Sequence, residues 1–227
     1  MKRKAAIQAP MEETTVLLHT CCAPCSSAII EAMLDSGITP VIYYCNPNIY
    51  PQEEYEIRKE ECTRYAQALG LEIVDADYDH VNWLAIMKGL ENEPERGGRC
   101  LRCFKFRLLR TAKYAHERGI KVITTTLASS RWKSLDQINE AGRWACDSLC
   151  QMTAQSLLDS ERSSCAIETA GVSRQGIEPF PSENEVVWWD HNWRKGGLQE
   201  RRLQIIKEYD FYNQQYCGCE FSVRKDD

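Results

Sequence analysis

Three cysteines within five residues constrain this chain more than any other feature. Cys21, Cys22 and Cys25 follow an apolar segment at 14–20 and overlap residues that favour a helix start. In open α/β sheets, ligands bind where the carboxyl ends of the strands meet the following helices. We therefore expect the chemistry of this protein to lie at the end of its first strand.

The chain alternates short apolar segments with longer helical patterns. Strands are expected at 14–20, 40–45, 71–75, 121–127 and 186–189, and helices at 24–34, 53–70, 81–90, 99–118, 135–150 and 198–209. Successive strand–helix passages imply parallel strands joined by right-handed crossovers. The sequence therefore predicts an α/β fold with a doubly wound parallel sheet.

Length and local composition set the expected domain organisation. The 227 residues fit one domain, so 1–13 is interpreted as a flexible tail and 14–227 as a single domain. Residues 151–185 are rich in Ser, Gln and Glu and show little periodicity. We interpret about 146–187 as an inserted segment of this domain.

Overall composition favours a cytoplasmic protein with reduced thiols. The 12 cysteines make up about 5% of the chain, below the 8–10% typical of secreted disulfide scaffolds. The amino-terminal residues lack the apolar core of a signal peptide, and no apolar run approaches a membrane span of about 18 residues, so no membrane association is expected. A formal net charge of −5 does not indicate a protein that binds nucleic acid over its whole surface, so any basic surface that binds nucleic acid must be local. In this setting, clustered cysteines indicate metal binding or redox chemistry.

The cysteines include three close pairs: Cys21 with Cys22, Cys100 with Cys103, and Cys217 with Cys219. Free backbone amides and the helix dipole stabilise thiolates at a helix start. Thiolates of the first two pairs suit a tetrahedral zinc ion or an iron–sulfur cluster, and buried free thiols are the alternative. The remaining cysteines that we interpret as buried free thiols are Cys45, Cys62, Cys146, Cys150 and Cys165.

Several ordered motifs carry a resemblance to a known family. They lie at 19–25, 44–55, 98–103, 124–127 and 216–219, and only the tail and about 146–187 fall outside the similarity. In these motifs the chain resembles the cobalamin-independent epoxyqueuosine reductases, which complete queuosine biosynthesis on tRNA. Its segment at about 146–187 is longer than the family's usual connection.

The resemblance implies a Rossmann-like fold related to the adenine-nucleotide α-hydrolase (HUP) group. It also implies a [4Fe–4S] cluster, with Cys21, Cys22, Cys100 and Cys103 as ligands. Cys217 and Cys219 are implied to be a redox-active, disulfide-forming pair. The implied substrate is tRNA carrying epoxyqueuosine, and the reaction needs an electron donor that the sequence does not identify.

Two parts of the implied reaction stay open at this stage. The epoxide oxygen must leave as water, which consumes two electrons and two protons. Cys217 and Cys219 either act as a dithiol, although a disulfide across one residue is strained, or bind a second iron ion beside the cluster. The candidate proton donors are His19, Asp190 and His191, each of which also fits a structural role.

Two groups of residues are candidates for binding RNA. A basic run starts at the second cysteine pair and comprises Arg96, Arg99, Arg102, Lys105, Arg107, Arg110 and Lys113. A later group mixes aromatic and basic side chains at Trp188, Trp189, Trp193, Arg194 and Lys195. Such mixtures favour RNA binding, and the alternative is a solvated helix face with tryptophans in the core.

Two other functions share parts of this pattern. Enzymes of the ATP-pyrophosphatase type that modify tRNA have the same architecture, but their phosphate-binding turn needs glycines, which 20–25 lacks. A zinc-stabilised RNA-binding domain without catalytic activity needs only the thiolates and a basic face. Metal identity distinguishes that domain from a reductase.

Overall fold

The fold is a five-stranded parallel sheet covered by helices on both faces. The computed structural model describes residues 6–164, 185–214 and 216–222. The strands are β1 (Thr15–Thr20), β2 (Thr39–Tyr44), β3 (Ile73–Asp75), β4 (Val122–Thr125) and β5 (Val187–Trp188), in the spatial order β3-β2-β1-β4-β5. Every pairing is parallel. The predicted doubly wound α/β fold is confirmed.

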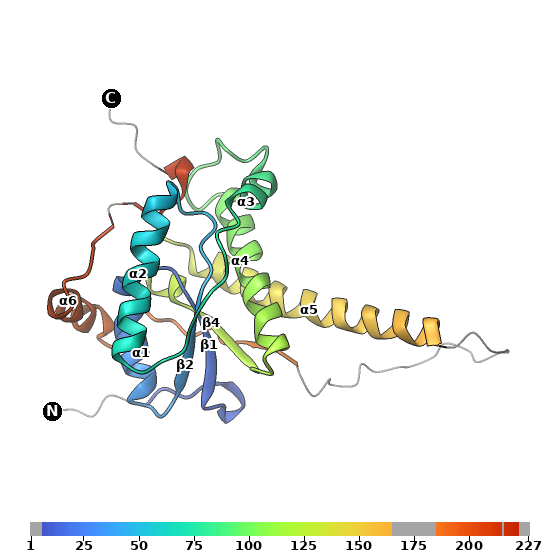
Figure 1. The fold of residues 1–227 in the computed structure, drawn as a ribbon, viewed down its shortest axis with the longest axis horizontal. Coiled ribbons are helices and arrows are strands. Elements are labelled where there is room, and N and C mark those ends of the chain that lie inside the picture. Colours follow the sequence, from blue (N-terminus) through green and yellow to red (C-terminus); the bar gives the residue numbers. More distant parts are fainter. Residues whose placement is uncertain (1–5, 165–184, 215, 223–227) are drawn as a thin grey trace.

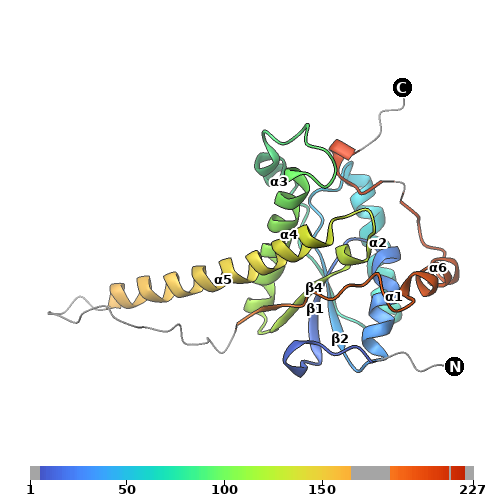
Figure 2. The same ribbon diagram turned by 180° about the vertical axis from the view of Figure 1, so that it is seen from behind.

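The helices form two layers around this sheet (Figure 1 and Figure 2). They are α1 (Ala23–Leu34), α2 (Gln52–Ala68), α3 (His80–Met87), α4 (Gly98–Glu117), α5 (Leu135–Ser164) and α6 (Leu198–Glu208). Short 3-10 turns lie at Pro10–Glu12, Thr126–Ser129 and Glu220–Ser222. Helices α1 and α2 cover one face, where α6 packs on α1, and α4 and α5 pack together on the other.

The central strand β1 is the most deeply buried part of the sheet. Leu17 and Leu18 are fully enclosed, since β1 is paired on both sides and covered on both faces. A near-continuous apolar run is typical of such a strand. This burial fixes the end of β1, and hence the residues that follow it, in the middle of the sheet's carboxyl edge.

Helix α5 differs most from the sequence-based expectation. The sequence predicts that it ends near residue 150, but it continues to Ser164, so the predicted end of this helix is wrong. These residues contain no proline or glycine to stop the helix. The outer half of α5 extends away from the sheet (Figure 1). The remainder of the expected insertion, 165–184, lies outside the described residues.

Part of the expected tail packs against the domain. Ala9 is buried, and the backbone N–H of Ile7 donates to Oγ of Ser36 at 3.0 Å. Residues 1–5 lie outside the described part of the chain, so a flexible tail there stays a prediction. Among the helices that the structure describes, none has the length and apolar character needed to cross a lipid bilayer.

Candidate metal and redox site

Hydrogen bonds tie together the strand ends around the first cysteine group. Cys22 occupies the N-cap position of α1 with an extended backbone. The backbone N–H of Cys21 donates to Oγ1 of Thr126, just beyond β4, at 3.2 Å. Beyond β2, the side-chain amide of Asn46 donates to the carbonyl oxygen of Thr20 at 2.8 Å. The ends of β1, β2 and β4 therefore form one rigid platform for the thiols.

The thiols of Cys21, Cys22 and Cys25 form a compact group on this platform. Their Sγ atoms lie within 4.8 Å of one another, and those of Cys21 and Cys22 are 3.8 Å apart. Thiolates around a tetrahedral zinc ion, with zinc–sulfur distances of about 2.3 Å, lie about 3.8 Å apart. The spacing suits a soft metal centre. In the part of the chain that the structure describes, Cys100 and Cys103 do not join this group at that spacing.

The three thiols share their negative charge unequally. Hydrogen bonds with Cys22 and Cys25 hold the pKa of Cys21 well below its ordinary value. Burial raises the pKa of Cys22, and the hydrogen bond with Cys21 raises the pKa of Cys25 to about 12. The side-chain amide of Gln214 donates to Sγ of Cys22 at 2.7 Å. Cys21 is therefore the thiol of this group that ionises most readily.

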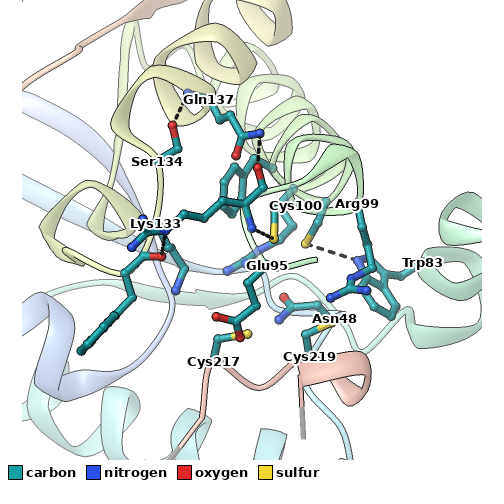
Figure 3. Close-up of a pocket in the computed structure, with 15 residues that line it drawn as sticks. Asn48, Trp83, Glu95, Arg99, Cys100, Lys133, Ser134, Gln137, Cys217 and Cys219 are labelled. Atoms are coloured by element: carbon teal, nitrogen blue, oxygen red, sulfur yellow. Dashed lines mark hydrogen bonds between the residues drawn. The ribbon is translucent and has the colours of Figure 1, made fainter. Parts of the chain in front are cut away.

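A cavity beside this platform brings together the other two cysteine pairs (Figure 3). Cys100 and Cys103 line it from α4, and Cys217 and Cys219 line it from the C-terminal segment. Figure 3 shows Cys100 facing Cys217 and Cys219 across this cavity. The rim and walls also include Asn48, Glu95, Arg96, Trp132, Lys133 and Gln137. Four thiols from segments more than a hundred residues apart therefore meet at one place.

The inner end of the cavity is apolar. Cys103 and Cys219 are 6% and 8% exposed and pack with Trp83 and Met87. The indole N–H of Trp83 donates to Sγ of Cys103 at 3.4 Å. Burial raises the pKa of Cys219 to about 12, and the neighbouring Cys217 adds to this rise. Because Cys217 is exposed and Cys219 is buried, the two thiols of the C-terminal pair have different chemistry.

Lys133 connects the cavity to the first cysteine group. It is half-buried in the loop after β4 and lines the cavity. Burial acts to lower the pKa of Lys133, but the thiols of Cys217, Cys21 and Cys25 raise it, and the net direction is upward. One ammonium group thus lies within electrostatic reach of both groups of thiols. Sequence reasoning missed Lys133, although its position directly after a central strand was a usable signal.

His19, the first candidate proton donor, is closed off from the site. It is fully buried, with Nδ1 2.6 Å from Oγ1 of Thr125 and Nε2 3.0 Å from the carbonyl oxygen of Cys45. Burial and the nearby Arg107 lower its pKa to about 3, so the imidazole is neutral at physiological pH. The structure places His19 in the frame that joins β1, β2 and β4.

Asp190 and His191 lie beyond β5, and neither lines the cavity. The carboxylate of Asp190 is 3.6 Å from the guanidinium of Arg143 at the surface. The imidazole of His191 packs against the rings of Trp189 and Trp193, and burial lowers its pKa. Of the three expected proton donors, none faces the cavity in the described structure.

The basic run of α4 is not a single exposed face. Arg99 and Arg107 are 3% and 2% exposed. Arg99 donates to the carbonyl oxygen of Glu91 at 2.6 Å, and Arg107 donates to that of Cys45 at 3.0 Å. Two further members pair with acidic side chains, Lys105 with Glu140 and Arg110 with Asp79. Arg99 and Arg107 are therefore not part of an exposed basic face, because their guanidinium groups satisfy buried loop carbonyls. Both nevertheless line the cavity.

Exposed aromatic surface lies elsewhere than expected. Trp189 and Trp193 are 6% and 1% exposed, which confirms the alternative interpretation of core tryptophans. Trp132 is 70% exposed at the cavity, with the guanidinium of Arg131 5.8 Å from its ring centre. Arg96 donates to the carbonyl oxygen of Trp132 at 2.8 Å. Sequence reasoning missed Trp132, which adjoins two basic residues in a loop at the carboxyl edge of the sheet.

The other cysteines differ in burial. Cys45 and Cys62 are buried, as expected. Cys146 is half-buried and Cys150 is exposed on α5, so the buried interpretation is wrong for Cys150. Cys165 lies outside the described residues. Cys217 and Cys219, like every cysteine that the structure describes, are free thiols, so the structure does not support a disulfide between them.

Comparison with known proteins places this chain in one family. The sequence model of the family described as "Epoxyqueuosine reductase QueH" matches residues 16–170 and 151–225. The chain is 42% identical over 218 residues to a protein of that name from Histophilus somni, covering 96% of this chain and 76% of the relative. A relative of the same name from Haemophilus influenzae is 41% identical, with 96% and 75% covered. One from Acinetobacter baylyi is 40% identical over 223 residues, with 98% and 87% covered.

Proposed function

The chain belongs to the epoxyqueuosine reductase QueH family, and from this premise we propose that it reduces epoxyqueuosine in tRNA to queuosine. The reaction breaks both C–O bonds of the epoxide, forms the alkene and releases the oxygen as water. It consumes two electrons and two protons. The observation that carries this proposal is the cavity in which thiols of α4 and of the C-terminal segment meet, together with the compact group of Cys21, Cys22 and Cys25 at the carboxyl edge of the sheet.

A [4Fe–4S] cluster is the proposed cofactor, and the donor set fits it. The ligands that we propose are Cys21, Cys22, Cys100 and Cys103. All four are free thiols, and such soft donors select iron–sulfur clusters or zinc. A bound cluster supplies electrons one at a time. The Sγ atom of Cys25 lies within 4.8 Å of those of Cys21 and Cys22, so the chain offers one more thiol there than the proposed cluster needs.

Cys217 and Cys219 are the proposed reactive pair. The exposed thiol of Cys217 faces the cavity, whereas Cys219 lies in the apolar cluster with Cys103. This arrangement is compatible with either role, a dithiol that delivers electrons or two ligands of a second iron ion. In both roles Cys217 is the member of the pair on the substrate side of the cavity.

We assign delivery of a proton to the leaving oxygen to Lys133. Among the described residues that line the cavity, it is the only lysine, and it lies near Cys217. An ammonium group stabilises the negative charge that develops on an epoxide oxygen and can then donate a proton to it. Among the described residues that line the cavity, Glu95 is the one carboxylate.

The cavity rim offers contacts for the nucleoside and for RNA. Oδ1 of Asn48 and Oε1 of Gln137 are buried and have no hydrogen-bond partner in the described structure, so both are available to accept from the substrate. The exposed ring of Trp132, with Arg131 beside it, is a platform on which an unpaired base can stack. We propose that this rim binds the tRNA.

Metal analysis tests this proposal first. Iron, zinc and acid-labile sulfide are measured per chain in protein purified without oxygen, together with its visible spectrum. About four irons with matching sulfide, followed by turnover of epoxyqueuosine-tRNA with a chemical reductant, support the reductase. An iron excess points to the second ion. About one zinc and no sulfide after reconstitution contradicts the proposal and favours the zinc-stabilised RNA-binding domain.

A further inference from the structure

A buried ion pair on α2 lies directly beneath the C-terminal cysteine pair. Arg58 is 3% exposed and Glu54 is 7% exposed. Nε and Nη2 of Arg58 lie 2.7 and 2.6 Å from Oε1 of Glu54. The other carboxylate oxygen of Glu54 accepts from the hydroxyl of Tyr212 at 2.9 Å. Both oxygens of the carboxylate are therefore satisfied, which fixes the guanidinium in one orientation.

The guanidinium also holds the backbone of the reactive segment. Nη1 of Arg58 donates to the carbonyl oxygen of Cys217 at 3.4 Å, and Nη2 donates to that of Tyr216 at 3.3 Å. The Tyr216 ring lies 5.3 Å from the guanidinium carbon. Arg58 thus contacts two successive peptide groups and one side chain of the segment that carries the cysteines.

The glycine between the two cysteines permits this close approach. Gly218 has φ +97°, and a Cβ there would lie 2.9 Å from Nη1 of Arg58 and 2.8 Å from Cγ1 of Ile49. On the other side, the carbonyl oxygen of Gly218 accepts from the backbone N–H of Tyr50 at 2.8 Å, and Cys219 bridges to Ile49. The segment is therefore clamped between α2 and the loop after β2.

We propose that Arg58, oriented by Glu54, is a positioning residue that fixes the Cys217–Cys219 segment so that its thiols face the cavity. The inference rests on the proposed role of this cysteine pair in the reaction. An isolated buried ion pair gives little net stability compared with apolar side chains of the same size. Here the remaining N–H groups of the guanidinium donate hydrogen bonds to the segment that carries Cys217 and Cys219. Such positioning matters because misplacement of a reacting group by about 1 Å lowers the rate about a hundredfold.

The experiment compares four variants of the full chain purified without oxygen. Arg58→Met removes the clamp, and Arg58→Lys keeps the charge without the planar group that reaches both carbonyls. Glu54→Gln/Arg58→Met removes both charges and leaves no unpaired buried carboxylate, which keeps the test valid if the single variant fails to fold. Arg64→Met is the matched control, because Arg64 also lies on α2 and donates to a C-terminal carbonyl, that of Tyr209, at 2.9 Å.

The first readout is the rate at which iodoacetamide alkylates Cys219, mapped by mass spectrometry. We expect a rise of at least about tenfold in Arg58→Met and in the double variant, a smaller rise in Arg58→Lys, and none in Arg64→Met. The second readout is steady-state kinetics, in which kcat falls about a hundredfold while KM for tRNA stays within about twofold.

Two results would overturn the inference. One is an unchanged alkylation rate at Cys219 in both variants that lack Arg58, and the other is the same rise in Arg64→Met. Failure of the proposed function gives a different pattern. If Cys217→Ser keeps full activity while Cys219 still becomes reactive without Arg58, the positioning role holds and the reactive role of the pair is wrong.

Discussion

The indole Nε1 of Trp83 donates a hydrogen bond of 3.4 Å to Sγ of Cys103, inside the apolar cluster that also contains Cys219. Hydrogen bonds to cysteine ligands raise the reduction potential of an iron–sulfur cluster, because they stabilise the more negative reduced form. We therefore expect Trp83 to tune the proposed cluster through the proposed ligand Cys103.

Trp83→Phe should lower the cluster's midpoint potential. Loss of a hydrogen bond worth about 1 kcal/mol corresponds to about 40 mV for a one-electron couple. A redox titration followed by electron paramagnetic resonance measures the shift. Trp144→Phe, an exposed tryptophan on α5, serves as the control and should leave the potential unchanged. An equal midpoint potential in Trp83→Phe and wild type would contradict this prediction. It would mean either that Cys103 is not a cluster ligand or that its hydrogen bond with Trp83 does not affect the potential.

Cys217→Ser should stop turnover while the visible absorption of the cluster stays intact. A serine hydroxyl replaces neither a redox-active thiol nor a soft ligand, so we expect activity to fall more than about a hundredfold. Single-turnover assays with reduced protein measure this loss. Cys150→Ser changes an exposed thiol on α5 and should retain full activity. Full activity in Cys217→Ser would exclude this thiol from the reaction.

Lys133→Met should lower kcat by about a hundredfold to ten-thousandfold, the usual contribution of a general acid. Lys133→Arg keeps the positive charge but donates a proton far less readily, so it should recover tRNA binding without recovering kcat. Lys105→Met is the control, since Lys105 pairs with Glu140 on the outer surface at 2.8 Å. Recovery of kcat in Lys133→Arg would show that Lys133 acts through charge alone.

Trp132→Ala should weaken tRNA binding by about fivefold to 150-fold, because stacking of one base on an aromatic ring contributes about 1–3 kcal/mol. Arg131→Ala should weaken tRNA binding. It should also reduce the slope of the logarithm of the binding constant against the logarithm of salt concentration by the amount that about one phosphate contact contributes. Fluorescence anisotropy at several salt concentrations measures both effects. Equal affinities for wild type and Trp132→Ala would place the RNA on another surface.

The fold was predictable because its signals are local. The apolar run of β1 and the alternation of strands with helices each depend on residues close in sequence, and the structure confirms them. The end of α5 was not predictable in this way. Its outer residues are rich in Ser and Gln, which is typical of a loop, but they include no residue that stops a helix. Composition alone therefore failed where helix-breaking residues were the deciding factor.

The site was only partly predictable, because its geometry depends on contacts between distant segments. Close spacing along the chain identified the cysteine pairs, yet nothing local shows that Cys103 and Cys219 share one apolar cluster. Burial of Arg99 and Arg107 depends on loop carbonyls that only the folded chain presents. Trp132 and Lys133 lie between an expected strand and an expected helix, and their approach to the cavity follows from how that connection folds.

The clamp on the C-terminal segment has a consequence for how the protein is made. The platform formed by β1, β2 and β4 and the thiols on α4 involve only residues before about 130, so the ribosome translates them before α5, β5 and the C-terminal segment. At about 5–20 residues per second, Cys217 and Cys219 emerge several seconds later. A nascent chain thus carries the four proposed cluster ligands before the ribosome has made Cys217 and Cys219, so we expect the proposed cofactor site to be complete in sequence before the proposed reactive pair is.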